Sequence, residues 1–218
     1  MRDHYQVNEI FTSVQGEGIL QGTPSTFIRL QGCTVGCPWC DTKYTWAKGG
    51  ERMLVRAILQ EIHTRHVVIT GGEPTMYDLD PLIAGIRAPG DRYIQLETSG
   101  QFALKGDLIP NFVTWSPKEN IGFATDPSLA QLAHEVKWVV DETLSFEVVE
   151  NTWHWLMNLH NDMVYSMPYF VFMPEGCPAE KPMIDKTLEW IRRRVPQSAI
   201  EEEKVRFGDR LQYRIGVE

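Results

Sequence analysis

The chain is poor in several features that would define a class of protein at once. Its four cysteines in 218 residues are too few and too unevenly placed for a disulfide-stapled secreted domain. No run reaches the roughly 18 apolar residues of a membrane span, and the first residues lack the apolar stretch of a signal peptide. Basic residues number 21 against 29 acidic, and the net charge of −8 argues against a sequence-independent grip on nucleic acid or lipid. We expect a cytoplasmic protein that binds neither nucleic acid nor membrane.

What the chain does have is the composition of an ordinary globular protein. Hydrophobic residues make up 43% and charged residues 23%, which suffices for a sizeable core. There is no internal repeat, low-complexity tract or linker. We expect one domain spanning residues 1–218.

Short apolar runs rich in β-branched residues alternate with longer segments of helical character, separated by turns rich in Gly, Pro or Ser. Several of the runs are continuously apolar, as in parallel strands covered on both faces. This βα rhythm predicts an α/β fold, and about six or seven strands fit, too few for a complete eight-stranded barrel. We therefore expect a partial (incomplete) βα TIM-like barrel. The predicted strands are residues 25–30, 66–70, 93–97, 112–116, 135–140, 169–173 and 204–207. The predicted helices are residues 52–64, 79–87, 127–133, 144–159 and 182–194.

Three of the cysteines, Cys33, Cys37 and Cys40, crowd into a C-x3-C-x2-C loop directly after the first predicted strand. Such clustering indicates a metal site. A structural zinc ion needs four ligands, and Cys177 or a histidine could supply the fourth. The alternative is a 4Fe-4S cluster in which three irons are held by cysteine and the fourth stays open to a ligand. The spacing alone favours the cluster without excluding zinc.

The cysteine loop resembles that of the radical S-adenosylmethionine (radical SAM) superfamily, with the aromatic Trp39 directly before the last cysteine. Residues 71–74, Gly-Gly-Glu-Pro, follow the second predicted strand, where that superfamily carries a motif for the amino group of SAM. The superfamily has a full or partial βα barrel. Two matching motifs at matching strand ends are stronger evidence than either alone.

Further segments resemble one family within it, the 7-carboxy-7-deazaguanine synthases. These are residues 8–18 (NEIFTSVQGEG), 27–33 (FIRLQGC), 40–42 (CDT), 97–100 (ETSG) and 116–118 (SPK). The resemblance covers about the first 120 residues well and the rest loosely. It implies a lyase that converts 6-carboxy-5,6,7,8-tetrahydropterin to 7-carboxy-7-deazaguanine with loss of ammonia, in 7-deazapurine (queuosine) biosynthesis. The C-terminal residues, RLQYRIGVE, lack the His and Lys found in a related branch, which leaves their contacts open.

The resemblance also implies cofactors and the residues that bind them. Cys33, Cys37 and Cys40 would hold the 4Fe-4S cluster, and the hydroxyl of Thr42 would bind a magnesium ion, which prefers oxygen ligands. The carboxylate of Glu73 suits the SAM ammonium group. The implied SAM-binding residues are Trp39, Cys40, Asp41, Gly72, Glu73, Gly100, Ser116, Pro117 and Lys118.

The implied substrate is a flat heterocycle with hydrogen-bonding edges and one carboxylate, which requires amide, carboxylate and cationic partners. Its implied binding residues are Val14, Gln15, Gly16, Glu17, Arg29 and Thr98. Taken alone, an arginine on a strand such as Arg29 is more often a surface or paired residue. We expect no catalytic side chain, because the reactive radical is carried by the cofactor.

Two alternatives remain open on sequence grounds. A glycyl-radical activating enzyme shares the cysteine spacing but acts on a protein partner. The segments around Gln15 and Thr98 favour instead the 7-carboxy-7-deazaguanine synthases, which act on a small molecule. A non-catalytic zinc-binding module would use the same cysteines without SAM. The resemblance further implies a flavodoxin- or ferredoxin-type reductant and a homodimer, with Cys177 a free thiol rather than a cluster ligand.

Overall fold

The computed structural model describes residues 4–160, 167–176, 179–193 and 203–216 of the chain. The strands are β1 (His4–Val14), β2 (Pro24–Leu30), β3 (Glu51–Leu54), β4 (His66–Gly71), β5 (Tyr93–Thr98), β6 (Phe112–Trp115), β7 (Glu135–Val140), β8 (Tyr169–Pro174) and β9 (Val205–Phe207). The helices are α1 (Val55–Gln60), α2 (Asp80–Arg87), α3 (Pro127–Leu132), α4 (Phe146–His160), α5 (Lys181–Arg193) and α7 (Leu211–Ile215). Among these described helices, none is long and apolar enough to cross a membrane.

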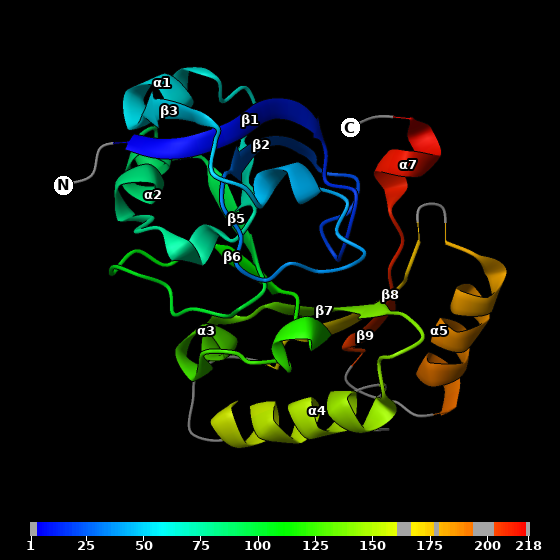
Figure 1. Cartoon of the computed structure of the whole chain (residues 1–218). Helices are drawn as coiled ribbons and strands as arrows, with labels where there is room; N and C mark the ends of the chain where they lie inside the picture. Colours follow the sequence, from blue (N-terminus) through cyan, green and yellow to red (C-terminus); the bar gives the residue numbers. More distant parts are fainter. Residues whose placement is uncertain (1–3, 161–166, 177–178, 194–202, 217–218) are drawn as a thin grey trace.

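All nine described strands form one sheet in the order β3-β1-β2-β4-β5-β6-β7-β8-β9 (Figure 1). From β2 onward each strand pairs with its neighbour in parallel, whereas β1 pairs antiparallel with both β2 and β3. The two end strands, β3 and β9, do not pair with each other, so the sheet is curved but not closed. The predicted partial barrel of about six or seven parallel strands is confirmed.

The predicted elements agree with the structure except at the N-terminal edge and in the C-terminal tail. All seven predicted strands are present within one or two residues of their predicted bounds. The predicted helix over residues 52–64 is wrong at both ends, because its start lies in β3 and its end lies beyond α1. Neither β1 nor α7 was predicted, and residue 194, the end of the last predicted helix, lies outside the described residues.

Alternation along the strands divides the sheet into an apolar outer face and a polar inner face. In β5, Ile94 and Leu96 belong to a core cluster that α1 and α2 also join, while Gln95 and Glu97 point the other way. In β7, Val136 and Trp138 belong to a second core cluster with α3 and α4. Because successive side chains of a strand face opposite sides, the residues between them face the inside of the curved sheet. This inner face carries the site.

Candidate active site

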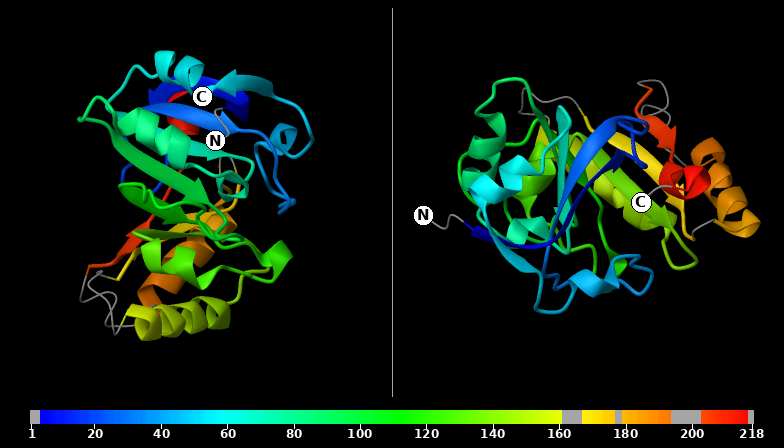
Figure 2. Two further views of the ribbon diagram at one scale, coloured as in Figure 1. Left: turned by 90° about the vertical axis from the view of Figure 1, so that its left-hand side faces the viewer. Right: turned by 90° about the horizontal axis from the view of Figure 1, so that it is seen from above.

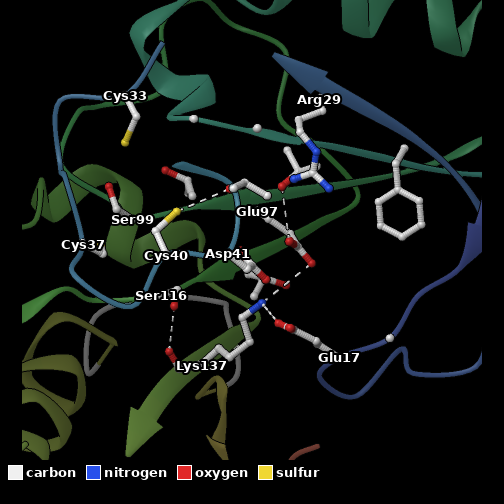
Figure 3. Close-up of a pocket in the computed structure, with 18 of the residues that line it drawn as sticks. Glu17, Arg29, Cys33, Cys37, Cys40, Asp41, Glu97, Ser99, Ser116 and Lys137 are labelled. Carbon is white, nitrogen blue, oxygen red and sulfur yellow. Dashed lines mark hydrogen bonds and ion pairs between the residues drawn. The ribbon is translucent and has the colours of Figure 1, made fainter. Parts of the chain in front are cut away.

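A cavity of about 630 Å³ opens at the carboxyl ends of the parallel strands, where enzymes of barrel type place their chemistry. Its walls come from the loops after β2, β4, β5 and β6, from the β1–β2 loop, from inward-facing side chains of β1, β2 and β7, and from the tail with α7. In Figure 3 the labelled cysteines lie on one side of this cavity and Glu17 and Arg29 on the other. The cavity thus has a cysteine end and a polar end.

The cysteine end is formed by the loop that follows β2. Cys33, Cys37 and Cys40 all line the cavity as free thiols, and the backbone N–H of Val35 donates to Cys33 Sγ at 3.4 Å. Burial raises the pKa of the Cys33 and Cys37 thiols, so a bound metal would be needed to ionise them near neutral pH.

A set of three thiols fits a 4Fe-4S cluster with one open iron. Among the described residues, no three His, Cys, Asp or Glu side chains gather around the position of a single ion. A four-iron cluster does not require this, because each thiolate binds a different iron.

The glycine turn after β4 lies directly against the cysteine loop. Gly72 donates its N–H to Leu30 O at 3.0 Å, and Glu73 donates its N–H to Gly32 O at 2.8 Å. A Cβ atom on Gly72 would lie 1.9 Å from Gly32 O and 3.0 Å from Cys33 Cβ. Any side chain at this position would separate the two loops, which explains the glycine and places the turn beside the thiols.

The Glu73 carboxylate has a different position from the one expected. It is buried, and its two oxygens accept hydrogen bonds from Thr75 N and Oγ1, Thr98 Oγ1, and Ser99 N and Oγ. Gly72 lines the cavity, but Glu73 is not among its lining residues. The carboxylate therefore joins the loops after β4 and β5 behind the cavity wall, where it holds the lining residues Thr98 and Ser99 in place.

Two other residues expected to bind SAM, Gly100 and Pro117, are also not among the lining residues. At Gly100, φ is +79° and an added Cβ would lie 2.6 Å from the Trp115 ring. Packing against Trp115, rather than exposure to the cavity, explains this glycine.

The loop after β6 supplies a lysine to the cysteine end. Lys118 Nζ donates to Ser116 Oγ at 2.6 Å and lies 4.8 Å from the centre of the Trp39 ring. Burial lowers the pKa of Lys118. Ser116, Lys118 and Trp39 all line the cavity and together form a cationic and aromatic wall beside Cys37.

At the polar end, Gln15 is buried and holds the β1–β2 loop to the sheet. Its Nε2 donates to Gln95 Oε1 and Glu97 Oε1, both at 3.0 Å, and its Oε1 accepts from the N–H of Glu17 at 3.1 Å. Arg29 lines the same region but its Nε is paired with Glu9 Oε1 at 2.6 Å.

Lys137, which sequence reasoning missed, occupies the centre of the polar end. Its Nζ lies 2.6 Å from Glu17 Oε2 and 3.8 Å from Glu97 Oε1 (Figure 3). Burial alone would raise the pKa of Glu17, but the charges of Lys137 and Arg210 outweigh it and lower this pKa to about 2. Glu17 is therefore an ionised hydrogen-bond acceptor throughout the physiological pH range.

The C-terminal tail reaches the same carboxylate. Arg210 Nε lies 3.2 Å from Glu17 Oε1, Gln212 Nε2 lies 3.4 Å from the same oxygen, and Leu211 donates its N–H to Gly16 O at 2.9 Å. Seen from above in Figure 2, α7 lies beside the end of the β1–β2 hairpin. In place of a histidine or lysine, this tail brings an arginine and a glutamine to the cavity.

Most residues predicted for the site line this one cavity. They are Val14, Gln15, Gly16, Glu17, Arg29, Cys33, Cys37, Trp39, Cys40, Asp41, Thr42, Gly72, Thr98, Ser116 and Lys118. The hydroxyl of Thr42 lies 3.4 Å from Cys40 Sγ, at the cysteine end. Cys177 lies outside the described residues.

The main lining residues that sequence reasoning missed are Glu97, Ser99, Lys137, Arg210 and Gln212. Glu97 and Ser99 lie within a segment already recognised as a motif. The sequence did contain a signal for Lys137. Glu135 and Lys137 occupy alternate positions of an otherwise apolar strand, and charged residues are rarely buried unless paired, so the pattern indicates that Lys137 has a partner.

The partial barrel carries three free thiols on a C-x3-C-x2-C loop with a glycine turn beside them. These features define the class of protein as the radical SAM enzymes. Residues 27–107 match the model of the radical SAM superfamily. A structure of SuiB bound to its precursor peptide SuiA, from Streptococcus suis, covers 80% of this chain with a TM-score of 0.55 at 13% identity, a likeness of fold alone.

More similar proteins identify the family. The chain is 38% identical to the 7-carboxy-7-deazaguanine synthase of Escherichia coli K12, over 67% of this chain and 76% of that protein. The corresponding enzyme of Aquifex aeolicus is 36% identical, over 66% and 68% of the two chains. The crystal structure of QueE from Escherichia coli matches 94% of this chain and 93% of its own, with a TM-score of 0.69 at 29% identity. The chain belongs to the 7-carboxy-7-deazaguanine synthase family of radical SAM enzymes.

Proposed function

We propose that this chain is the lyase that converts 6-carboxy-5,6,7,8-tetrahydropterin to 7-carboxy-7-deazaguanine, with loss of ammonia, in 7-deazapurine (queuosine) biosynthesis. The observation that carries the proposal is the single cavity that joins three thiols at one end to a set of fixed hydrogen-bonding groups at the other. This arrangement suits an enzyme that must hold a cofactor and a polar heterocycle in contact. We further propose that residues 1–218 act as one domain.

At the cysteine end, Cys33, Cys37 and Cys40 would hold three irons of a 4Fe-4S cluster. When bound, the cluster and SAM supply the one-electron chemistry that abstracts a hydrogen atom from the substrate. The residues proposed to hold SAM are Trp39, Cys40, Asp41, Gly72, Ser116 and Lys118, with Glu73, Gly100 and Pro117 supporting them from behind the wall. The contribution of Glu73 is then to fix the turn rather than to bind the ammonium group through its carboxylate.

At the polar end, the protein fixes the substrate before reaction. Gln15 offers the remaining accepting capacity of its amide oxygen and ionised Glu17 an acceptor-only carboxylate to the pterin edge, and the backbone of Val14 and Gly16 lies beside them. Thr98 lines the cavity at the end of β5, where its hydroxyl donates to the Glu73 carboxylate. Arg29 would offer the guanidinium N–H groups that Glu9 leaves available to the substrate carboxylate.

We also propose that Thr42 contributes its hydroxyl to a Mg²⁺ ion shared with the substrate carboxylate. The support is its place on the cavity wall at the cysteine end, and the preference of Mg²⁺ for oxygen ligands.

As a member of this family, the enzyme takes a small-molecule substrate and needs an electron donor. We propose that this donor is a flavodoxin- or ferredoxin-type protein and that the enzyme is a cytoplasmic homodimer that binds neither nucleic acid nor membrane. Light scattering during gel filtration tests the oligomeric state.

The decisive experiment is anaerobic reconstitution with iron and sulfide, followed by incubation with SAM, a reductant and the tetrahydropterin. The expected result is a brown protein that forms 7-carboxy-7-deazaguanine, detected by mass spectrometry. Cys37→Ala should lose iron and product, whereas Cys177→Ala should keep both. A colourless zinc protein, or a cluster protein that leaves the pterin unchanged, would refute the proposal.

A further inference from the structure

Two charged residues of β7 fix the loop that carries Glu17. Glu135 Oε2 accepts the N–H of Ile19 at 2.7 Å, and the loop packs so closely that a Cβ on Gly18 would lie 2.4 Å from Glu135 Oε1. Two residues further along the strand, Lys137 reaches the Glu17 side chain itself. The strand thus holds the backbone of the loop at one position and its carboxylate at the next inward-facing position.

Lys137 is the cation nearest to Glu17. Its Nζ is 2.6 Å from Glu17 Oε2, its side chain is only 8% exposed, and a second carboxylate, Glu97, lies 3.8 Å away on its other side. In Figure 3 the lysine nitrogen lies between the two carboxylates. A cation in this position offsets the partial burial of two negative charges and fixes the direction in which each points.

Other charged groups also face Glu17, and each has a different geometry. Arg210, from the tail, reaches the other carboxylate oxygen at the longer distance of 3.2 Å, and Gln212 beside it is neutral. Lys118 at the cysteine end is attracted to Glu17 without a direct contact, and Glu135 holds only the loop backbone. No described group other than Lys137 reaches Oε2, so removal of its charge leaves a partly buried carboxylate with one cation at one oxygen.

We propose that Lys137 is a positioning residue that keeps Glu17 ionised and directed at the donor edge of the substrate. The inference rests on the proposed function, in which Glu17 accepts hydrogen bonds from the pterin. An ionised carboxylate only accepts, whereas a protonated one carries a donor that would face the donors of the substrate. Lys137 therefore acts on substrate binding through Glu17. Its support is geometric, and the lowered pKa of Glu17 agrees with it.

The first test is a double-mutant cycle on equilibrium binding of the tetrahydropterin, measured anaerobically on cluster- and SAM-loaded protein between pH 5.5 and 8. Lys137→Met should weaken binding about 10- to 100-fold, the range for an unpaired buried group. The loss, taken relative to the parent at each pH, should grow toward pH 5.5, because burial then favours protonation of Glu17. The double variant Lys137→Met/Glu17→Gln should bind within about threefold of Glu17→Gln alone. Additive losses, or a loss that does not change with pH, would overturn the proposal.

The second test needs no substrate and separates this inference from the proposed function. Infrared difference spectra report the protonated carboxyl band of Glu17, which is assigned by its absence in Glu17→Gln. The parent and Lys137→Arg should show no such band between pH 8 and 5, whereas in Lys137→Met the band should appear as the pH falls. Lys48→Met, the same change at an exposed lysine, is the control. Circular dichroism and iron content establish that each variant is folded, and Lys137→Gln replaces Lys137→Met if the latter is not.

The outcomes are distinguishable. A parent protein that does not bind the pterin, together with a Glu17 band that depends on Lys137, contradicts the proposed function but not the effect of Lys137 on Glu17. A parent that binds the pterin, together with a Glu17 band that is absent in every lysine variant, contradicts the inference alone.

Discussion

Replacement of Glu73 by Gln distinguishes two roles for this residue, one expected from sequence and one seen in the structure. The carboxylate is 1% exposed and accepts five hydrogen bonds, three at Oε1 and two at Oε2. An amide keeps one oxygen and turns the other position into a donor. In the more favourable of the two amide orientations, the NH₂ group faces Ser99. The Ser99 hydroxyl can rotate to accept a hydrogen bond from this group, but the Ser99 backbone N–H loses its acceptor. That loss costs about 1–3 kcal/mol, and each remaining bond weakens by roughly 1 kcal/mol once the acceptor is neutral.

Burial of an amide instead of a charge offsets part of this cost. We therefore expect Glu73→Gln to lower the free energy of unfolding by about 2–4 kcal/mol. Urea unfolding followed by circular dichroism, at matched iron content, measures the change. Glu61→Gln, the same substitution at an exposed residue, should stay within about 0.5 kcal/mol of the parent. If Glu73→Gln is as stable as the parent but loses affinity for SAM, then its carboxylate binds SAM and our reading of the turn is wrong.

Three further predictions follow from the geometry. Gly72→Ala should abolish cluster content, because its Cβ would meet Gly32 O at 1.9 Å. Gly90→Ala strains a φ of +90° but meets nothing within 4 Å, so it should keep the iron, and equal iron content in both variants would refute this. Thr42→Val should reduce magnesium stimulation of turnover while leaving the absorption of the cluster unchanged, and undiminished stimulation would count against the proposed ligand. Burial lowers the pKa of His134 below its usual value of 6.5, so the unfolded chain binds more protons and stability should fall as the pH drops below about 6.5. In His134→Asn, which keeps an acceptor for Val113 N, the melting temperature should fall less between pH 6.5 and 5.5; an unchanged slope would exclude His134 as the cause.

The parallel part of the fold was predictable because each of its strands is a short apolar run between turns. The first strand, β1, was not, although Tyr5 and Val7 are buried at alternate positions. Its pairing with β2 shifts register between Val7 and Glu9, and such a bulge interrupts the period-2 pattern by which a strand is recognised. The edge strand β3 was missed for a related reason, since its four residues are mostly exposed and run directly into α1.

The residues of the site also divide into those that could be predicted from the sequence and those that could not. Residues within local motifs, such as Cys33, Gly72 and Gln15, could be found because their spacing along the chain reflects their chemistry. Lys137 could not be assigned, because its partners Glu17 and Glu97 come from distant segments and only the curvature of the sheet brings them together. For Arg210 the tail offered no motif that indicated a contact with Glu17, 193 residues earlier.

The distance along the chain between Glu17 and Arg210 also determines when the cavity is completed during biosynthesis. At about 5–20 residues per second, a ribosome adds the 193 residues between Glu17 and Arg210 in roughly 10–40 s. The cysteine loop is synthesised early in this interval, whereas the wall contributed by the tail does not exist until its end. We expect the nascent protein to present its three thiols in a cavity whose polar end still lacks the contacts of Arg210 and Gln212 with Glu17.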